Sequence, residues 1–145
     1  MTEERRFMLR TFTGVALALL APDGSFTDIN YNYTQAALWP AYNHSKRVEW
    51  LAAAWITPGS IHYNSSAVLA RTLAALDWWL VHGPDVTRRQ TTWWWSVIGV
   101  PITLGITANI LAPQLLPNQT AAAAAQLALA HYNGFTGANL VWTAE

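Results

Sequence analysis

A chain of 145 residues is the usual size of one domain, so we expect a single unit over residues 1–145 with one buried core. Apolar residues make up 52% of the chain and charged residues only 11%, against roughly 25% in a typical soluble domain, which argues against disorder and suits part of a larger assembly. The formal net charge is zero and cysteine is absent, so nothing supports a nucleic-acid surface, and a disulfide framework, a thiolate zinc site and a cysteine nucleophile are excluded.

The first 22 residues, MTEERRFMLRTFTGVALALLAP, allow two interpretations. An apolar stretch at 12–21 behind a basic segment is typical of a signal peptide, although Glu3 and Glu4 reduce the positive charge that such a segment needs. The alternative is an amphipathic helix that ends at the Pro-Asp-Gly breaker, 22–24, and we favour it.

The residues after this breaker, 23–33, are rich in turn formers and predict a connecting loop. Four Asn-x-Ser/Thr sequons suit an exported, extracellular glycoprotein, and they lie at Asn32, Asn43, Asn64 and Asn118. The competing interpretation is that these asparagines belong to ordinary polar turns that carry no sugar.

Two helices joined by a short link are predicted next. The first ends at the Thr-Pro-Gly breaker, 57–59, and its apolar face consists of Val48, Leu51, Ala52 and Trp55. The second has a leucine at every third or fourth position over 69–80, with Ser65 or Ser66 as its N-cap and a His-Gly-Pro breaker at 82–84. Together they form an antiparallel helix hairpin.

The uncharged run 97–116 has about the length of a membrane span, which requires roughly 20 apolar residues. Its interior does not suit a span, because it is interrupted by Pro101, Gly105, Asn109 and Pro113. Its flanks also lack the Lys/Arg asymmetry that orients a membrane helix. We therefore expect a buried core helix that starts near Pro101, where the missing N–H is harmless.

An alanine run predicts the last helix. Thr120 can cap Ala121 to Ala130, whose intrinsic helix propensity is high, and this helix should end near Asn133-Gly134. No segment alternates apolar and polar residues as a half-buried strand does. The fold class is therefore all-α, and successive helix hairpins suit a bundle or a curved array.

The chain has nine tryptophans, and five of them lie at two places, 78–79 and 93–95. Neighbouring residues on a helix point about 100° apart, so three consecutive tryptophans cannot all enter one core. If 91–96 is a loop before the core helix, its rings can line a concave wall that stacks on sugars. The competing interpretation is packing between helices, which weighs most for Trp78 and Trp79.

Three motifs resemble one family. TTWWWSVIGVP (91–101) resembles the Asn-Trp-Trp-x-x-Glu-Ile-Gly-x-Pro signature of polysaccharide lyase family 8, whose members degrade hyaluronan, chondroitin and xanthan. GFTGANLVW (134–142) resembles the family's Thr-Gly-Ala-Asn segment, and DGSFTDINY (23–31) and Trp39-Pro40 resemble its upstream landmarks. The resemblance implies helix hairpins that form part of an incomplete (α/α) toroid, with a cleft for an anionic polysaccharide substrate.

The resemblance also implies residue roles. Trp93 and Trp94 match the aromatic patch that stacks on sugars, and Asn139 matches the catalytic asparagine. In the family that amide holds the uronate carboxylate, so that a preorganised donor stabilises the carbanion formed when the C5 proton leaves. A tyrosine takes the proton, and no metal or cofactor is needed. Further substrate contacts are expected from Trp95, Arg88, Arg89 and Phe135, although the arginine pair can equally be solvated.

This sequence departs from the family pattern in two ways. The family's histidine, tyrosine and supporting arginine lie downstream of the Gly-Ala-Asn segment, and the chain ends at Glu145. We therefore expect the chain to be inactive alone and to need the missing C-terminal part of the same lyase. Within the tryptophan motif, Thr92, Trp95 and Val97 replace polar or acidic residues. A structural or surface role is expected for the four histidines, which are His44, His62, His82 and His131.

Other functions stay open at this point. A noncatalytic carbohydrate-binding helical module, or a decayed lyase remnant, would keep the tryptophans without the elimination chemistry. A membrane-associated helical protein would explain the uncharged run. A glycoside hydrolase is less favoured, because no carboxylates are obviously paired to flank a glycosidic bond.

Overall fold

The computed structural model describes residues 2–33, 39–84 and 94–128. Their elements are α1 (Glu3–Leu19), α2 (Tyr42–Ile56), α3 (Ser66–His82), the π-helical turn η1 (Trp95–Gly99), α5 (Val100–Leu111), the 3₁₀ turn η2 (Ala112–Gln114) and α6 (Pro117–Ala128). The β-type pairing in these ranges is one isolated bridge between Leu20 and Phe26. The predicted all-α class is confirmed.

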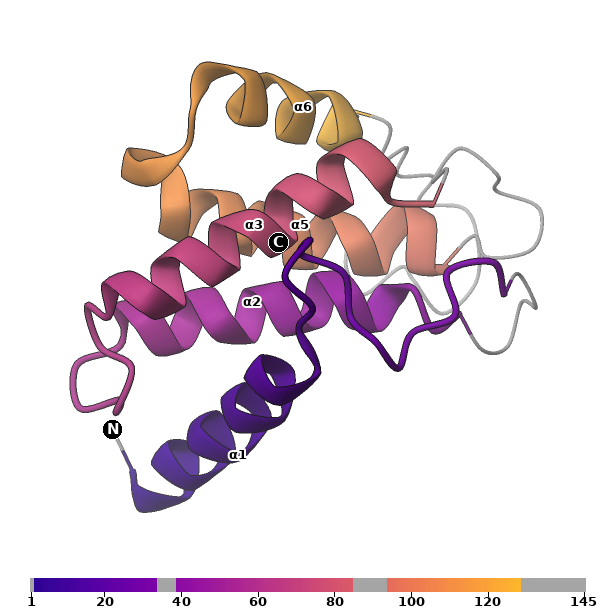
Figure 1. Ribbon diagram of the computed structural model, residues 1–145. Coiled ribbons are helices and arrows are strands. Elements are labelled where there is room, and N and C mark those ends of the chain that lie inside the picture. The colour runs from indigo at the N-terminus through magenta and orange to yellow at the C-terminus, as the bar shows by residue number, and fades with distance from the viewer. Residues whose placement is uncertain (1, 34–38, 85–93, 129–145) are drawn as a thin grey trace, which may run out of the picture.

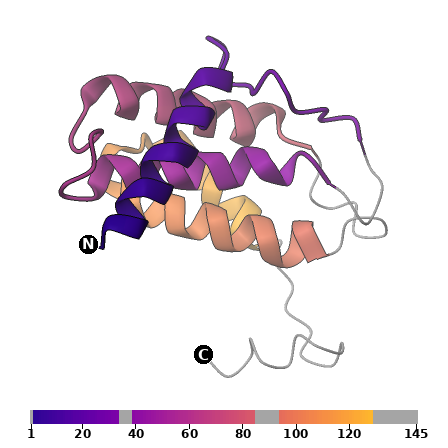
Figure 2. The ribbon, with the colours of Figure 1, turned by 90° about the horizontal axis from the view of Figure 1, so that it is seen from below.

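Helix α2 lies at the centre of the molecule (Figures 1 and 2). It packs against α1, α3 and α5, and α6 covers α5 and α3. The α2–α3 pair is an antiparallel hairpin, α5 runs back beside α2, and α6 reverses direction again (Figure 1). The N-terminal end of α2, the C-terminal end of α3 and the start of η1 therefore lie at the same end of the molecule.

The predicted N-terminal helix is present as α1. Its C-terminal carbonyls, which have no partner within the helix, accept hydrogen bonds from Arg71 on α3. The guanidinium Nη2 lies 3.0 Å from the Leu17 carbonyl oxygen and 2.6 Å from that of Leu20. On the side facing α2, the ring of Phe12 stacks on Trp50 with centroids 4.7 Å apart. Arg71 thus caps α1 and fixes it to the helix hairpin.

The loop expected at 23–33 is present, and it also contributes to the core. Phe26 is 1% exposed and Ile29 is 9% exposed, so the loop inserts apolar side chains beside the hairpin. Arg47 on α2 holds it through two hydrogen bonds to the Asp28 carboxylate, at 2.5 and 2.7 Å, and lies 4.9 Å from the centroid of the Phe26 ring. These hydrogen bonds lower the pKa of Asp28.

The predicted boundaries of the α2–α3 hairpin are confirmed. Helix α2 ends at Ile56, where the hydroxyl of Thr57 donates to the Ala53 carbonyl oxygen over 2.6 Å. Of the two possible caps for α3, Ser65 is the N-cap, because its hydroxyl accepts from the Val68 N–H. Helix α2 begins at Tyr42, earlier than its apolar face suggests.

The core helix is confirmed as α5, which begins at Val100 and has Pro101 in its first turn, as predicted. Trp94 and the π-turn before α5 already have helical backbone, so Trp94 and Trp95 belong to helical structure and not to a loop. The Val100 N–H donates to the carbonyl of Trp95, five residues earlier. Proline has no N–H, and its ring would clash with the carbonyl four residues before it in a regular α-helix, so a wider turn accommodates it.

Helix α5 buries five side chains, which are Val100, Thr103, Leu104, Thr107 and Leu111. Two isoleucines on its other side, Ile102 and Ile106, are each 41% exposed. Across the described ranges, the helices are too short or too polar to cross a membrane.

The predicted cap of the last helix is wrong. Helix α6 begins at Pro117, whose fixed backbone angle suits the first helical position, and Thr120 lies inside the helix. The side chain of Gln119 accepts from the N–H of Leu116 over 3.0 Å, which is one half of a capping box. The hydroxyl of Thr120 instead donates to the Leu116 carbonyl. The final two residues of the predicted run, Leu129 and Ala130, lie outside the described residues.

Candidate aromatic site at one end of the helix hairpin

Two of the predicted substrate-binding residues, Trp94 and Trp95, lie within the described ranges. The other predicted site residues lie outside them, and these are Arg88, Arg89, Trp93, Phe135 and Asn139. The described part of the candidate site therefore consists of the two tryptophans and the side chains that contact them.

Trp94, Trp95 and Tyr42 form what we call the aromatic trio. The two indoles meet edge to face, with centroids 4.6 Å apart and planes at 87°. The ring of Tyr42 lies 4.7 Å from Trp95 at 40° and 6.3 Å from Trp94 at 72°. All three side chains are partly buried. Burial raises the pKa of the Tyr42 hydroxyl, which therefore stays protonated at neutral pH.

Gly99 makes this packing possible. A Cβ atom at this position would lie 2.9 Å from Cε2 of Tyr42, closer than real Cβ atoms approach, and 3.1 Å from Cζ3 of Trp94, which is tighter than most real contacts. The glycine of the Trp-Trp-x-x-x-Ile-Gly motif therefore leaves space for the ring of Tyr42 from α2 and for that of Trp94, which directly precedes η1. Sequence reasoning did not select Tyr42, although it follows the Trp39-Pro40 landmark by two positions.

A buried layer of side chains supports the trio. Trp39 is 5% exposed, Trp79 is 1% exposed, and their rings meet at 68° with centroids 6.3 Å apart. The indole N–H of Trp79 donates to Oε1 of Gln126 on α6 over 3.1 Å, which satisfies a buried donor. The packing role expected for Trp79 is confirmed. Trp95 and Tyr42 pack against this layer from outside.

His44 lies at the centre of a buried hydrogen-bond network next to this layer. Its Nε2 lies 2.8 Å from the Ala75 carbonyl oxygen, which can only accept, so Nε2 carries the proton. Nδ1 is then an acceptor, and the Tyr31 hydroxyl donates to it over 2.8 Å while accepting from the N–H of Phe26. The ring also stacks on Trp78 at 5.1 Å and 21°.

Burial changes the acidity of both groups in this network. It lowers the pKa of His44 to about 4 and raises the pKa of Tyr31 to about 12. At neutral pH both are uncharged, and His44 has no exposed surface from which to reach a substrate. The structural role expected for His44 is confirmed, whereas His131 lies outside the described residues.

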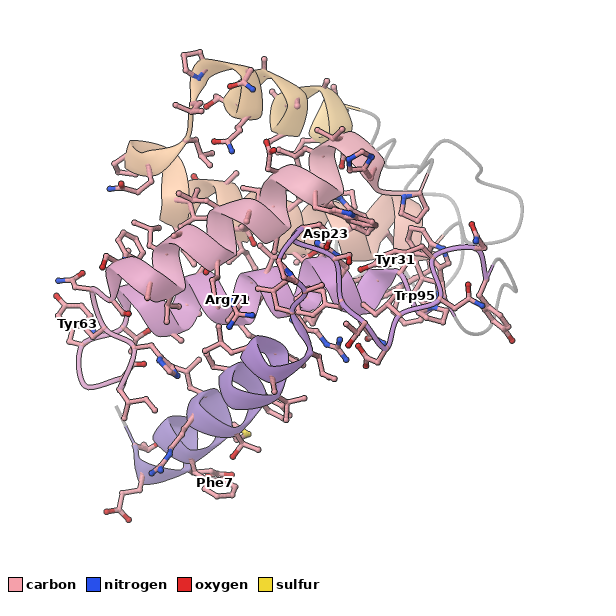
Figure 3. All side chains as sticks on the ribbon, viewed as in Figure 1. Phe7, Asp23, Tyr31, Tyr63, Arg71 and Trp95 are labelled. Carbon is pink, nitrogen blue, oxygen red and sulfur yellow. The ribbon has the colours of Figure 1, made fainter. Side chains whose placement is uncertain are left out.

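Figure 3 shows where these groups lie. Trp95 and Tyr31 are at the end where α2 begins, and Tyr63 is at the opposite end, in the link between α2 and α3. A cavity of about 340 Å³ opens elsewhere, between the start of α1 and that link, and it is lined by Glu3, Phe7, Leu9, Arg10, Gly59, Ser60 and Ile61. Because this lining includes both an acid and a base, it does not favour an anionic chain, and we assign the candidate site to the aromatic trio.

The arrangement is suited to binding and not to proton transfer. Flat, partly exposed rings stack on the apolar faces of sugars, and indole N–H groups can bond to hydroxyls. Within residues 2–33, 39–84 and 94–128, no three His, Cys, Asp or Glu side chains gather as a metal site requires.

The described helices, with paired hairpins and an aromatic end, define the chain as part of an α/α toroid of the kind found in polysaccharide lyases.

Comparison with known proteins agrees with this class. Residues 17–143 match the family described as polysaccharide lyase family 8, N-terminal alpha-helical domain. The chain belongs to polysaccharide lyase family 8. It is similar to chondroitinase-AC of Pedobacter heparinus, with 29% identity over 89 residues, which make up 61% of this chain and 12% of that protein.

Two solved structures have the same fold. One is a chondroitinase AC lyase known from enzyme–oligosaccharide complexes, with a TM-score of 0.69 and 21% identity over 82% of this chain and 18% of that chain. The other is a Paenibacillus xanthan lyase, with a TM-score of 0.70 and 18% identity over 96% of this chain and 14% of that chain. The chain thus spans less than a fifth of the length of these relatives.

Proposed function

We propose that this chain forms part of the substrate cleft of a lyase that cuts a uronate-containing polysaccharide by β-elimination, of the hyaluronan, chondroitin or xanthan class. The observation that carries the proposal is the aromatic trio at the end of the helix hairpin, found in a chain that belongs to this family. Of its two indoles, Trp94 matches the family's sugar-stacking patch, and Trp95 follows it in the same motif. The names of the relatives, a chondroitinase and a xanthan lyase, support the same substrate class.

In this proposal Trp94 and Trp95, with Trp93 beside them in the sequence, stack on sugar rings and align the polymer. Arg88, Arg89 and Phe135 add contacts to the anionic chain, and the arginines suit paired bonds to carboxylate or sulfate groups. Stacking is tolerant of sugar identity, whereas the charged contacts select an acidic polymer.

The proposed chemistry centres on Asn139. Its amide would donate to the uronate carboxylate and stabilise negative charge as the C5 proton leaves, which is the effect of a preorganised donor. The electron pair of that C–H bond forms the C4–C5 double bond, the C4–O bond breaks, and a proton is delivered to the leaving oxygen. The tyrosine and histidine for these proton transfers would come from a further part of the same lyase.

This function is tested by incubating the complete protein with hyaluronan, chondroitin sulfate and xanthan, and following the ultraviolet absorbance of unsaturated uronate ends. We expect one polymer to yield these ends, and Asn139→Ala to abolish the signal while polymer binding is retained. Failure of all three polymers to produce unsaturated ends would contradict the proposal. Binding without cleavage would favour the noncatalytic carbohydrate-binding module, or a decayed remnant, instead.

We also propose that the protein acts outside the cell, where a large polysaccharide is met. The asparagine of each sequon is exposed, at Asn32, Asn43, Asn64 and Asn118, so each could carry a glycan in a secretory host without disturbing the core. Fractionation of the producing culture, with and without peptide N-glycosidase treatment, tests location and glycosylation separately. A protein retained inside the cell would contradict the extracellular assignment.

A further inference from the structure

Tyr42 is the member of the aromatic trio that comes from another helix. It is the first residue of α2, and its N–H donates to the carbonyl of buried Trp39 over 3.0 Å. Ala41, immediately before it, is fully buried. The backbone that carries the Tyr42 ring is therefore fixed by the core, independently of Trp94 and Trp95.

The Tyr42 ring contacts both indoles and the helix that carries them. The centroid of the Tyr42 ring lies 4.7 Å from that of Trp95. It lies 6.3 Å from that of Trp94, and these two rings meet edge on. Cε2 and Cδ2 of Tyr42 lie 2.9 and 3.3 Å from the place where a Cβ of Gly99 would be. The ring thus occupies the space that the glycine leaves open.

The tryptophans need such a support because of where they lie along the chain. They stand at the start of the π-turn, in which the Val100 N–H bonds to the Trp95 carbonyl across the wider i to i−5 step. The widened turn changes the direction in which they project, relative to a regular α-helix. Besides the contact between the two indoles, the ring of Tyr42 packs against both of them from another helix, so it is placed to set their orientation.

We infer that Tyr42 is a positioning residue, which sets the mutual orientation of Trp94 and Trp95 and so pre-orders the surface on which the polysaccharide stacks. This inference rests on the proposed function for its consequence in binding, but its structural part does not. A side chain that is ordered before binding does not pay its rotamer entropy on binding. Losing that order should weaken affinity by about 3- to 10-fold for each tryptophan released.

The test compares four variants of the complete protein. Tyr42→Met keeps apolar volume without a ring, Tyr42→Phe keeps the ring without the hydroxyl, and Gly99→Ala crowds the Tyr42 ring and, less closely, the Trp94 indole. Tyr63→Met is the matched control, because Tyr63 is exposed at the opposite end of the hairpin. The measurements are near-ultraviolet circular dichroism, which reports the coupling of the indole pair, affinity for chondroitin sulfate, hyaluronan and xanthan, and kcat against KM on any polymer cleaved.

We expect Tyr42→Met and Gly99→Ala to change the indole dichroism and to raise Kd and KM by about 3- to 10-fold or more with kcat retained. Tyr42→Phe and Tyr63→Met should match the wild type in both respects. Unchanged dichroism in both Tyr42→Met and Gly99→Ala would overturn the inference, as would changed dichroism with wild-type affinity. If Tyr42→Met does not fold, the comparison of Gly99→Ala with Tyr42→Phe decides, because the first displaces the ring and the second keeps it in place.

The dichroism also separates this inference from the proposed function. A wild-type protein that binds none of the three polymers contradicts the proposed function. Altered dichroism in Tyr42→Met, with recovery in Tyr42→Phe, would in that case still establish Tyr42 as the residue that orients the indole pair.

Discussion

The hydroxyl of Tyr31 donates a hydrogen bond to Nδ1 of His44 over 2.8 Å, and this bond joins the loop after α1 to the centre of the α2–α3 hairpin. It requires the imidazole to be neutral, because a protonated Nδ1 cannot accept. The opposite nitrogen donates to the carbonyl of Ala75 on α3. One uncharged histidine therefore connects three segments of the chain.

Stability should consequently fall in mild acid. The folded pKa of His44 is lowered to about 4 from an unfolded value of 6.5, so the unfolded state binds the proton first. The contribution is fully present above pH 6.5 and is lost as pH falls from there towards 4, by up to about 3 kcal/mol in unfolding free energy. Urea unfolding across this range measures it. His44→Gln, whose amide offers an NH₂ donor group and a carbonyl acceptor but does not titrate, should flatten the dependence; an equally steep loss in that variant would exclude His44 as its source.

Replacing Thr13 with valine should stabilise the protein. Its hydroxyl is the buried side-chain polar atom without a hydrogen-bond partner in the described part of the chain, and the residue is fully buried in α1. Valine has nearly the same shape without that group, so Thr13→Val should raise the free energy of unfolding by about 1 kcal/mol. The same change at exposed Thr11 should have little effect, and denaturant titration compares the two. Destabilisation by Thr13→Val would mean that the hydroxyl does have a partner.

Two glycines should respond to alanine in opposite directions. Gly24 has φ of 95°, and a Cβ there would lie 2.3 Å from the Ala74 carbonyl oxygen, so Gly24→Ala should cost about 2–4 kcal/mol. Gly14 lies in α1 with nothing within 4 Å of its Cβ position, so Gly14→Ala should stabilise by up to about 1 kcal/mol. Thermal unfolding of both variants measures this. Equal effects at the two positions would show that the loop does not approach α3 as described.

The bond between Trp79 and Gln126 should hold α6 in place. An alanine-rich helix has few large side chains to fix its position, and this bond satisfies a buried indole N–H. Gln126→Met should cost about 1–3 kcal/mol, whereas Gln126→Glu, which keeps an acceptor, should cost less. Gln114→Met, at an exposed position, serves as the control in the same denaturant titration. A Gln126→Met variant as stable as the wild type would leave α6 held by other contacts.

The helices could be predicted from the sequence because local signals decide them. Leucine spacing and a capping serine define α3, and the Thr-Pro-Gly breaker ends α2, so these boundaries depend on residues close in the chain. The start of α5 next to Pro101 was predictable, whereas the π-turn before it was missed, because a proline at a helix start gives no sign of helical backbone ahead of it. The cap of α6 was missed because a threonine is the more usual capping residue, whereas here the side chain of Gln119 reaches back to the N–H of Leu116.

The candidate site was predictable only in part. The adjacent tryptophans stand out in the sequence, but Tyr42 joins them through folding, and a lone tyrosine at a helix start carries no signal of its own. The role of Gly99 is likewise visible only once the rings of two helices meet over it. Long-range packing of this kind has no counterpart in local sequence patterns.

The most direct test of the lyase assignment is to cleave the polysaccharide with the complete protein in water enriched in oxygen-18. The masses of the products are then measured by mass spectrometry. Elimination breaks the C4–O bond without water, so we predict unsaturated products that carry no label. Hydrolysis adds one water across the bond. Labelled, saturated products would contradict the account and indicate a glycoside hydrolase.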